Sequence, residues 1–446
     1  MFIKKSNSAD IPVSFKEGAV ITNVITGESL TVNEMGAFFL SFLDDEAKCV
    51  EDIVFHIKEA FPDVPYEELY EDFTAYMSQL AECDLVKFGT TVEKLDFEPL
   101  NDLHIEITMK CNERCIHCFL PNKIKNEGST LGFSDFRNIV DDFVKMGGES
   151  IQLSGGEPMT HPDFLRMVEY CSLKSLNITI LSNLTLLDDD MIAKLKSYKV
   201  SGFQVSVYSL ESDVHDCITK CRGSLSKSIS AIERLRSEGF YVAVACPIMK
   251  QNANHLQSLY EYCRRENITL RSNTCLIQQT DGNASFTDGS RLLQEEKKQL
   301  YCKLANEMPD YIGNFLNSNT SSNDVKKFPE WFSRQSLCSA GSNTCSISPE
   351  GDVYPCPEWK AFKLGNIKNH SLCEIWRTSE KLRDLRRLNK RKNFPKCFSC
   401  PAIDYCKICL NMNALEKDGG MGAAQISQIF CDDAFMTKSL CERYGL

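Results

Sequence analysis

The sequence lacks a long uninterrupted apolar run, although it extends over 446 residues. No stretch approaches the roughly 20 apolar residues that a transmembrane helix needs. The N-terminal segment MFIKKSNSADIP has neither the apolar core nor the small-residue cleavage site of a secretory signal peptide. These absences predict a cytoplasmic protein without a membrane partner.

Basic surface is also scarce. The chain has 50 Lys and Arg against 61 Asp and Glu, and its formal net charge is −11. The one basic run, RRLNKRKNFPK, is short and is typical of a solvated helix end. Because phosphate backbones and anionic lipids repel an acidic chain, we expect no nucleic-acid partner.

Cysteine, by contrast, is abundant, with 22 residues. Disulfides are rare in the reducing cytosol, so clustered thiols there indicate metal or redox chemistry. Three cysteines lie within eight residues in ITMKCNERCIHCFL, and eight more lie at motif-like spacings between Cys338 and Cys431.

The pattern along the chain predicts a separate N-terminal unit over residues 1–92. IPVSF, AVITNVI, ESLTV and DLVKF are strand-like. Between them, Leu69, Phe73, Met77 and Leu80 recur on one face of a helix that begins at Pro65. Three strands with three helices indicate a small winged-helix-like module.

Residues 100–310 alternate between strands and helices. The strand-like segments are LHIEIT, SIQLS, NITILS, GFQVSVY, YVAVA and ITLRSN, and Gly147, Gly148 and Gly239 are placed to end helices. This order predicts an α/β fold, a partial (β/α)6 TIM-like barrel with ligands at the C-terminal ends of its strands. Residues 282–333 are polar, and SNTSSND within them is expected to be flexible. Residues 334–446 are rich in cysteine, which is typical of a domain that needs metal to fold.

The first cysteine cluster follows directly on the strand LHIEIT. Cys111, Cys115 and Cys118 can hold three corners of a [4Fe–4S] cluster and leave the fourth iron open to a cofactor. The alternatives are unrelated buried thiols or a zinc site, although zinc prefers four ligands. The Cys-x3-Cys-x2-Cys spacing, with His117 before the last cysteine, resembles the radical S-adenosylmethionine (SAM) family. The resemblance implies that SAM chelates the open iron and that His117 packs near the adenine.

A second motif, SGGEP, comes right after the next strand. Gly155 and Gly156 permit close approach of the backbone to a ligand, and Glu157 can accept hydrogen bonds from an ammonium group. Alone, this sequence would be an ordinary turn between strand and helix. It resembles the GGEP motif of the same family, which implies contact with the SAM amino group.

Weaker resemblances follow at later strands. Asn183 in LSNLT resembles a position near the SAM ribose, and Ser206 in QVSVYS resembles a SAM-contacting serine. HDCITKCRGS resembles a segment that carries an arginine for the SAM carboxylate, but Thr219 stands at that position here. We interpret His215 and Asp216 in this segment as a capping pair.

The C-terminal cysteines resemble the SPASM extension of radical SAM proteins, in which two auxiliary [4Fe–4S] clusters bind. The resemblance implies the ligands Cys338, Cys345, Cys356 and Cys409 for cluster one, and Cys397, Cys400, Cys406 and Cys431 for cluster two. Cys345 is the weakest match, and without it cluster one keeps an open iron that could hold a substrate thiolate. Paired CxxC motifs also suit two zinc sites, but the upstream radical SAM motif favours iron–sulfur clusters.

The N-terminal unit resembles the PqqD-like recognition element of enzymes that mature ribosomal peptides. The resemblance implies that a precursor's leader adds as a strand beside ESLTV and packs on the helix over residues 65–83. The alternative is a winged-helix scaffold without a ligand, and the acidic composition disfavours DNA binding.

Together, these resemblances imply a radical SAM/SPASM maturase with three [4Fe–4S] clusters, one of which binds SAM. The expected partners are a cysteine-containing precursor peptide and a one-electron donor such as flavodoxin or ferredoxin. The preferred reaction is an intramolecular thioether crosslink, similar to those of sactipeptide and ranthipeptide synthases. Carbon–carbon crosslinking and epimerisation begin with the same steps of the mechanism.

Two other functions stay open. Sulfatase-maturing enzymes share this plan, but they carry aspartate right after the cysteine that matches Cys356, where this chain has Pro357 and Glu358, and they lack the N-terminal module. A non-catalytic, zinc-organised peptide-binding scaffold is the second, which the intact cysteine and GGEP motifs disfavour. The sequence assigns no general base, although Glu358 and Tyr354 lie near Cys356.

Overall fold

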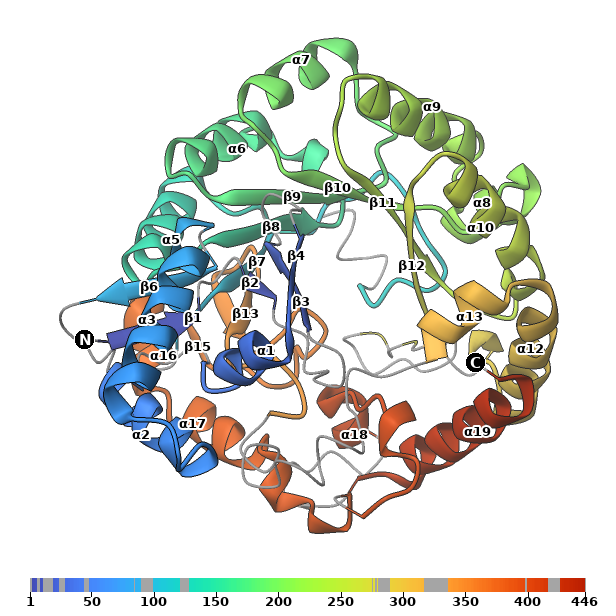
Figure 1. Cartoon of the computed structure of the whole chain (residues 1–446). Helices are drawn as coiled ribbons and strands as arrows, with labels where there is room; N and C mark the ends of the chain where they lie inside the picture. The colour runs from blue at the N-terminus through green and yellow to red at the C-terminus, as the bar shows by residue number, and fades with distance from the viewer. Residues whose placement is uncertain are drawn as a thin grey trace. The chain divides into compact units, whose positions relative to one another are not determined.

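The structure is a computed structural model (Figure 1). It describes residues 2–5, 9–10, 19–23, 29–43, 48–83, 85–89, 99–120, 128–274, 276, 279, 289–316, 336–397, 399–415 and 426–445. The chain divides into two compact units, Met1–Asp96 and Phe97–Leu446. Within the described residues, no helix has both the length and the apolar character that a membrane span requires.

The described residues of the first unit form three helices and two three-stranded sheets, ordered β5-β1-β6 and β2-β3-β4. Three of the predicted strands are confirmed as β3, β4 and β6, whereas IPVSF lies outside the described residues. The predicted amphipathic helix is α3, in which Leu69, Phe73, Met77 and Leu80 are buried. The elements are β1 (Phe2–Lys5), β2 (Ala9–Asp10), β3 (Ala19–Asn23), β4 (Ser29–Val32), α1 (Glu34–Leu40), β5 (Lys48–Cys49), α2 (Val50–Ala60), α3 (Tyr66–Glu82) and β6 (Val86–Gly89).

Strand β4 lies at the edge of its sheet. It pairs antiparallel with β3, and the order β2-β3-β4 gives it no neighbour on its other side among the described strands. Leu30 is paired with the buried Ile21 and shares its face with the buried Val32, yet Leu30 is 40% exposed. An apolar side chain at an open sheet edge is available for a further strand.

The second unit is built on a curved parallel sheet, as the strand–helix alternation predicts. Strands β7 to β12 pair in sequence order, and Figure 1 shows α5, α6, α7, α9 and α10 on the outer side of the curve. The elements are β7 (Asp102–Thr108), α5 (Phe133–Lys145), β8 (Ser150–Gly155), α6 (Phe164–Leu173), β9 (Asn177–Ser182), α7 (Asp189–Ser197), β10 (Gly202–Ser206), α8 (Ser212–Thr219), α9 (Ser224–Ser237), β11 (Val242–Pro247), α10 (Leu256–Arg265) and β12 (Thr269–Asn273).

The cysteine-rich region extends this sheet, which the sequence did not predict. β13 (Thr344–Ile347) pairs parallel with β7, and β14 (Asp352–Tyr354) and β15 (Gly365–Asn366) follow antiparallel, so the sheet has nine strands. The remaining helices are α16 (Leu372–Thr378), α17 (Glu380–Leu388), α18 (Leu410–Leu415) and α19 (Gln428–Tyr444). The barrel and the cysteine-rich region therefore share one sheet and one core.

In the polar region predicted over residues 282–333, the structure describes residues 289–316, which contain the helices α12 (Gln294–Glu307) and α13 (Pro309–Leu316). Leu300, Tyr301 and Leu304 are buried at helical spacing, and the many charged residues around them obscured that period in the sequence. The segment SNTSSND lies outside the described residues.

Two of the three predicted helix-ending glycines are confirmed. Gly147 and Gly239 follow α5 and α9 with φ of +82° and +87°. Gly148 does not take a left-handed φ, and a Cβ there would lie 2.2 Å from the Phe143 ring. Gly148 N donates to Phe143 O at 3.0 Å, so Gly148 contributes its backbone amide to the end of α5 and also packs closely against the helix.

Candidate functional site

The loop that carries Cys111, Cys115 and Cys118 begins at the C-terminal end of β7. Backbone hydrogen bonds fasten it to the end of α8, from Arg114 N to Thr219 O and from Ile116 N to Ile218 O, each 2.9 Å long. The Arg114 guanidinium also donates to the carbonyl of Cys111 at 2.6 Å. The described backbone therefore fixes the loop before any cluster binds.

The SGGEP segment lies against this cysteine loop. Gly156 N donates to Thr108 O at 2.7 Å, and Glu157 N donates to Lys110 O at 2.8 Å. A Cβ at Gly155 would lie 2.0 Å from Thr108 O, and one at Gly156 would lie 2.2 Å from Lys110 O. The glycines thus make room for the protein's own backbone, a close approach that the sequence analysis had assigned to a ligand.

Glu157 is buried at the centre of this contact, with 1% of its surface exposed. Its Oε1 accepts hydrogen bonds from Ser182 Oγ at 2.8 Å and Met159 N at 3.1 Å, and its Oε2 accepts from Asn183 N at 2.8 Å. Burial raises the pKa of Glu157 to about 7 against these donors. Because a carboxylate offers about four acceptor positions, a further donor such as the SAM amino group fits here.

Asn183 and Ser206, the two other predicted SAM contacts, lie at neighbouring strand ends. The Asn183 amide donates to Asn112 Oδ1 at 2.9 Å, which links the third strand to the cysteine loop. Ser206 ends β10 and makes a side-chain hydrogen bond with Tyr208. The ends of β7, β8, β9 and β10 thus bring the predicted residues to one edge of the sheet, as the barrel predicts.

His117 lies beside Tyr208, a residue that the sequence analysis missed. Their ring centroids are 4.8 Å apart, and Tyr208 in turn lies 5.3 Å from the ring of His215. Burial raises the pKa of Tyr208 well above its ordinary value, and the nearby Cys115 acts in the same direction. His117 is therefore one of three neighbouring rings beside the cysteine loop, together with Tyr208 and His215.

The segment with His215 and Asp216 has a structural function, as predicted. Asp216 accepts hydrogen bonds from Gly223 N at 2.5 Å and Leu225 N at 3.1 Å, at the start of α9. Thr219 is buried, and its hydroxyl lies 2.8 Å from that of Ser224. The capping interpretation holds for Asp216, whereas His215 Nδ1 accepts from Tyr208 N at 3.2 Å and supports the end of β10.

The C-terminal cysteines form two groups by their mutual proximity. Burial raises the pKa of Cys356 to about 12, and Glu358 and the thiols of Cys338 and Cys409 add to the shift. Burial likewise raises the pKa of Cys406 to about 12. The thiols that add to that shift are those of Cys397, Cys431 and Cys400. These groups contain all of the predicted auxiliary ligands except one.

That exception is Cys345, which lies on β13 in parallel register with Leu103. Neighbouring residues in register point to the same face of a sheet, so Cys345 faces the helix-covered core. It is 1% exposed, and burial raises the pKa of its thiol; the charged group that opposes this shift is Arg386 of α17.

No three His, Cys, Asp or Glu side chains in the described parts of the chain are arranged to hold a single metal ion. A four-iron cluster is bonded differently, because each thiolate binds its own iron and the ligands do not meet at one point. The three cysteine groups therefore stay candidates for the clusters that the sequence predicts.

The inner face of the barrel is polar beneath these loops. His104 and Glu106 alternate with the buried Leu103 and Ile105 along β7, so they point into the barrel. The Glu106 carboxylate pairs with the ammonium group of Lys360, from the turn after Cys356. This pair was not predicted from the sequence, although an acidic residue at an inward position of LHIEIT was a visible signal.

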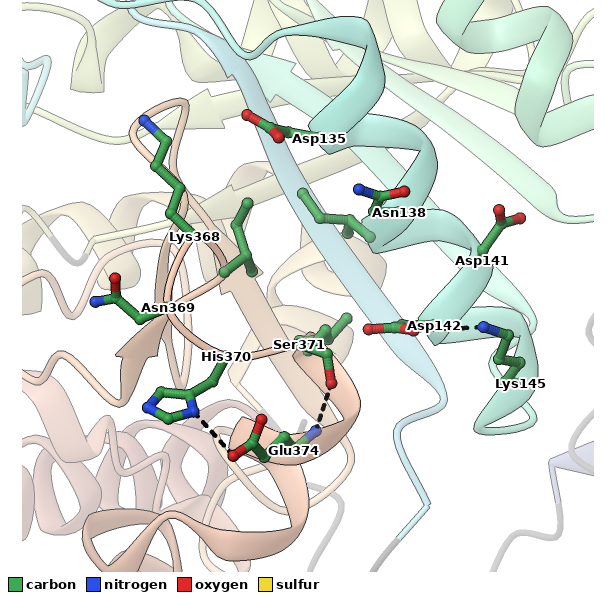
Figure 2. A pocket seen from close by; sticks show the side chains of 13 residues that line it. Asp135, Asn138, Asp141, Asp142, Lys145, Lys368, Asn369, His370, Ser371 and Glu374 are labelled. Carbon is green, nitrogen blue, oxygen red and sulfur yellow. Dashed lines mark hydrogen bonds and ion pairs between the residues drawn. The ribbon is translucent and has the colours of Figure 1, made fainter.

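The pocket drawn in Figure 2 lies elsewhere, between α5 and residues 367–374. His370 Nδ1 lies 2.8 Å from Glu374 Oε1, and Ser371 Oγ accepts from Glu374 N at 3.1 Å. None of the site residues predicted from the sequence lines this pocket, and we assign it no function.

Comparison with known protein families assigns three domains to the chain. Residues 105–263 match the radical SAM superfamily, and residues 338–401 match the SPASM iron–sulfur cluster-binding domain. Residues 18–86 match coenzyme PQQ synthesis protein D (PqqD). The chain is therefore a radical SAM enzyme. More particularly, it is a radical SAM enzyme with a SPASM extension and an N-terminal PqqD-like domain.

Individual proteins resemble it over most of their length. Mycofactocin maturase MftC of Mycolicibacterium smegmatis is 27% identical over 306 residues, 68% of this chain and 76% of that protein. An AdoMet-dependent heme synthase of Methanosarcina barkeri is 24% identical over 319 residues, 69% of this chain and 90% of that protein. The structure of Streptococcus suis SuiB bound to its precursor peptide SuiA superposes with a TM-score of 0.55 and 18% identity, covering 93% of this chain and 97% of SuiB. At this identity, the likeness to SuiB shows the fold alone.

Proposed function

We propose that this enzyme modifies a ribosomally made precursor peptide and forms an intramolecular thioether from one of its cysteines. The observation that carries the peptide substrate is the open edge of β4 in the PqqD-like domain, where a leader would add as a fourth strand. Support also comes from MftC, named as a maturase, and from SuiB, whose structure contains a precursor peptide.

The proposed SAM site consists of the cysteine loop, SGGEP and the ends of the next strands. Cys111, Cys115 and Cys118 would hold a [4Fe–4S] cluster, and Glu157 would accept a hydrogen bond from the SAM amino group. His117, Gly155, Gly156, Asn183 and Ser206 would line the rest of the site. When bound, SAM and this cluster would supply the radical chemistry that removes a hydrogen atom from the peptide.

Two auxiliary [4Fe–4S] clusters are proposed for the C-terminal region. Cluster two would take Cys397, Cys400, Cys406 and Cys431, which lie near one another. Cluster one would take Cys338, Cys356 and Cys409. Because Cys345 faces the core on the other side of the sheet, we propose that it is not a ligand and that one iron stays open for the peptide thiolate. This open iron is what favours a thioether over a carbon–carbon bond. A flavodoxin or ferredoxin would supply the electron.

The experiment that tests the proposal is anaerobic incubation with SAM, dithionite and the peptide encoded by a small cysteine-containing reading frame beside the gene. We expect 5′-deoxyadenosine and a peptide lighter by two hydrogens, in which one cysteine no longer reacts with iodoacetamide. Cys115→Ala is the control and should form neither product.

The other outcomes separate the alternatives. A lighter peptide whose cysteines all still react would indicate a carbon–carbon crosslink. Deuterium incorporation from D2O without a crosslink would indicate epimerisation. An unchanged peptide, together with turnover of an iron porphyrin, would overturn the proposal in favour of chemistry like that of the heme synthases.

A further inference from the structure

A buried ion pair joins the wall of the barrel to the cysteine-rich region. Glu106 on the inner face of β7 pairs with Lys360, and their side chains are 2% and 12% exposed. Two charges removed from water are costly unless their partners are well placed, and an apolar pair of similar size would avoid that cost. A pair of this kind inside the barrel therefore calls for a functional explanation.

Glu106 lies on the strand that leads into the cysteine loop, and Lys360 lies in the turn after Cys356. Glu106 lies two residues before Thr108, whose carbonyl accepts the amide of Gly156. Lys360 lies four residues after Cys356, a proposed ligand of cluster one. The pair thus stands between the supports of the SAM site and those of the auxiliary cluster.

Several groups face the pair from the elements packed around it. The Lys360 ammonium lies 4.6 Å from the centre of the Tyr354 ring. On the same inner face, His104 lies 3.4 Å from Gln152 Oε1 and 2.5 Å from Ser154 Oγ, and burial lowers its pKa to about 4, so it is neutral near pH 7. Burial raises the pKa of Glu106, Lys360 opposes that shift, and Glu350 adds to it.

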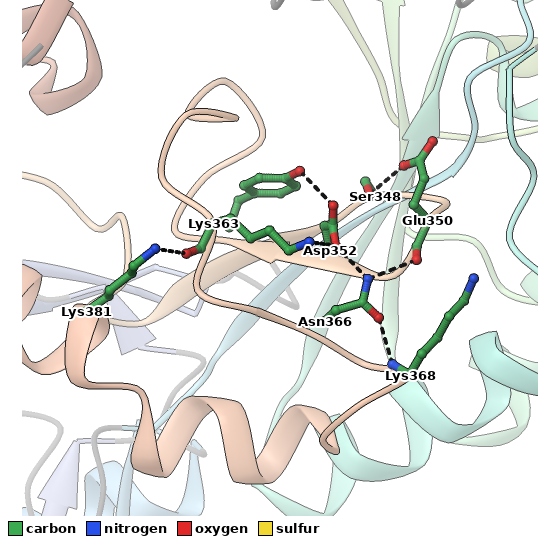
Figure 3. Close-up of polar contacts among 8 residues, drawn as sticks. Ser348, Glu350, Asp352, Lys363, Asn366, Lys368 and Lys381 are labelled. Atoms are coloured by element: carbon green, nitrogen blue, oxygen red, sulfur yellow. Dashed lines mark hydrogen bonds and ion pairs between the residues drawn. The ribbon is translucent and has the colours of Figure 1, made fainter.

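The polar side chains at the outer end of this group of residues are held by contacts with one another. Figure 3 shows Glu350 and Asp352 in a polar network with Ser348, Lys363 and Asn366. Ser348 Oγ donates to Glu350 at 2.7 Å, and Lys363 pairs with Asp352 at 2.5 Å. Tyr354 donates to Asp352 at 3.3 Å. These contacts keep the charges around Lys360 in place.

The proposed reaction needs a proton acceptor at this place. Joining two positions of a peptide removes two hydrogens: one leaves as an atom with 5′-deoxyadenosine, and the other leaves the cysteine thiol as a proton. The remaining electron passes to the auxiliary cluster, which balances the reaction. We propose that Glu106 is the acceptor of that proton and that Lys360 is a positioning residue that keeps the carboxylate ionised until the proton arrives. This inference rests on the proposed function.

Three of the other described carboxylates near the site are committed to other contacts. Glu157 accepts three hydrogen bonds, and Asp216 caps α9. Glu113 lies 3.3 Å from Cys115 Sγ, which would bind iron. The Glu106 carboxylate is held by the ammonium group of Lys360, at the end of a flexible side chain. It can therefore gain a proton without breaking the backbone contacts of the site.

The test compares Glu106→Gln in single turnovers with the matched control Glu238→Gln, which alters a surface ion pair with Lys196, using the same reading-frame peptide. We expect Glu106→Gln to retain its iron, SAM binding and 5′-deoxyadenosine formation, and to give about 100-fold less crosslinked peptide per 5′-deoxyadenosine at pH 7. At pH 9 the yield should recover about tenfold, because the peptide thiol, with an ordinary pKa of about 8.5, then loses its proton to water. Glu238→Gln should behave as the wild type.

A second readout does not depend on turnover. Infrared spectra recorded across a pH titration follow the protonation of carboxyl groups, and the difference between wild type and Glu106→Gln isolates the signal of Glu106. Lys360→Met should shift the titration of the Glu106 carboxyl to higher pH. Equal crosslinking and equal pH profiles in wild type and Glu106→Gln would overturn the assignment of Glu106 as the proton acceptor and leave the proposed function standing. A wild type that makes 5′-deoxyadenosine and leaves the peptide unchanged would overturn the proposed function, and the assignment of Glu106 with it.

Discussion

The amide of Glu157 donates a hydrogen bond of 2.8 Å to the carbonyl oxygen of Lys110, the residue before Cys111. The amide of Gly156 makes a similar bond of 2.7 Å to Thr108. The SGGEP turn and the cysteine loop are therefore one hydrogen-bonded unit. A change in either segment moves both the residues proposed for the cluster and the residue proposed for the SAM amino group.

Gly156→Ala should break this unit. The added Cβ would lie 2.2 Å from Lys110 O, so one backbone must move, at a cost of about 2–3 kcal/mol. We expect SAM affinity to fall at least about tenfold, which is about 1.4 kcal/mol, and 5′-deoxyadenosine formation to fall with it. Gly289→Ala is the control, because a Cβ there meets nothing within 4 Å. Wild-type SAM binding by Gly156→Ala would contradict the close contact.

The raised pKa of Glu157, about 7, predicts that SAM binding depends on pH. The ionised carboxylate accepts the amino group, so affinity should be about tenfold lower at pH 6 than at pH 8. Because SAM titrates too, Glu157→Gln supplies the comparison, and the difference between the two profiles isolates Glu157. Glu238→Gln, which alters a surface ion pair with Lys196, should leave the wild-type profile unchanged.

The raised pKa of Glu157 also affects the folding stability, which should fall as the pH rises, whereas the SAM affinity should increase. A carboxyl whose pKa is higher in the folded state than its ordinary value of 4.5 favours folding only while it is protonated. The SAM-free protein should therefore lose stability as pH rises from about 4.5 to about 7, by up to about 3 kcal/mol. Thermal unfolding across this range should show a smaller loss for Glu157→Gln, and an equal loss would contradict the assignment.

Much of this architecture could be predicted from sequence, because short spacings report local geometry. The cysteines follow the strand LHIEIT, and SGGEP, LSNLT and QVSVYS mark the ends of the next three strands. These positions predict that the four strand ends lie at one edge of the sheet. The pairing of β13 with β7 could not be predicted, because TCSI is short and its partner lies more than 200 residues away. The pair of Glu106 and Lys360 was missed for the same reason, since a contact across 254 residues leaves no spacing to recognise.

Iron content should identify the ligands of cluster one. Three clusters hold about twelve irons per chain. Cys345→Val should keep them all, because the side chain packs with Leu103 in the core and valine fits an apolar site. Cys356→Ala and Cys400→Ala should destabilise one cluster each and lose about four irons. The measurement is iron and sulfide analysis after anaerobic reconstitution. Loss of about four irons in Cys345→Val would restore Cys345 as a ligand.

Leu30 should contribute to leader binding at the edge of β4. It is 40% exposed although it shares a face with the buried Val32, and an added strand would cover it. Leu30→Asp should weaken binding of a fluorescent leader peptide at least about tenfold, because burying a new charge against the leader is costly. Without peptide, 5′-deoxyadenosine formation should stay at the wild-type rate, since the substitution lies in the other compact unit.

The matched control for this prediction is Phe55→Asp. Phe55 is 61% exposed and lies on α2 of the same domain, which is not one of the two elements of the proposed groove. Phe55→Asp therefore introduces the same charge at another exposed apolar position. Fluorescence anisotropy should then separate the two variants, with Phe55→Asp binding the leader like the wild type. If both variants bind equally well, the leader does not add beside β4. If both lose binding, the effect is one of charge on the whole domain, and the edge strand is not the specific determinant.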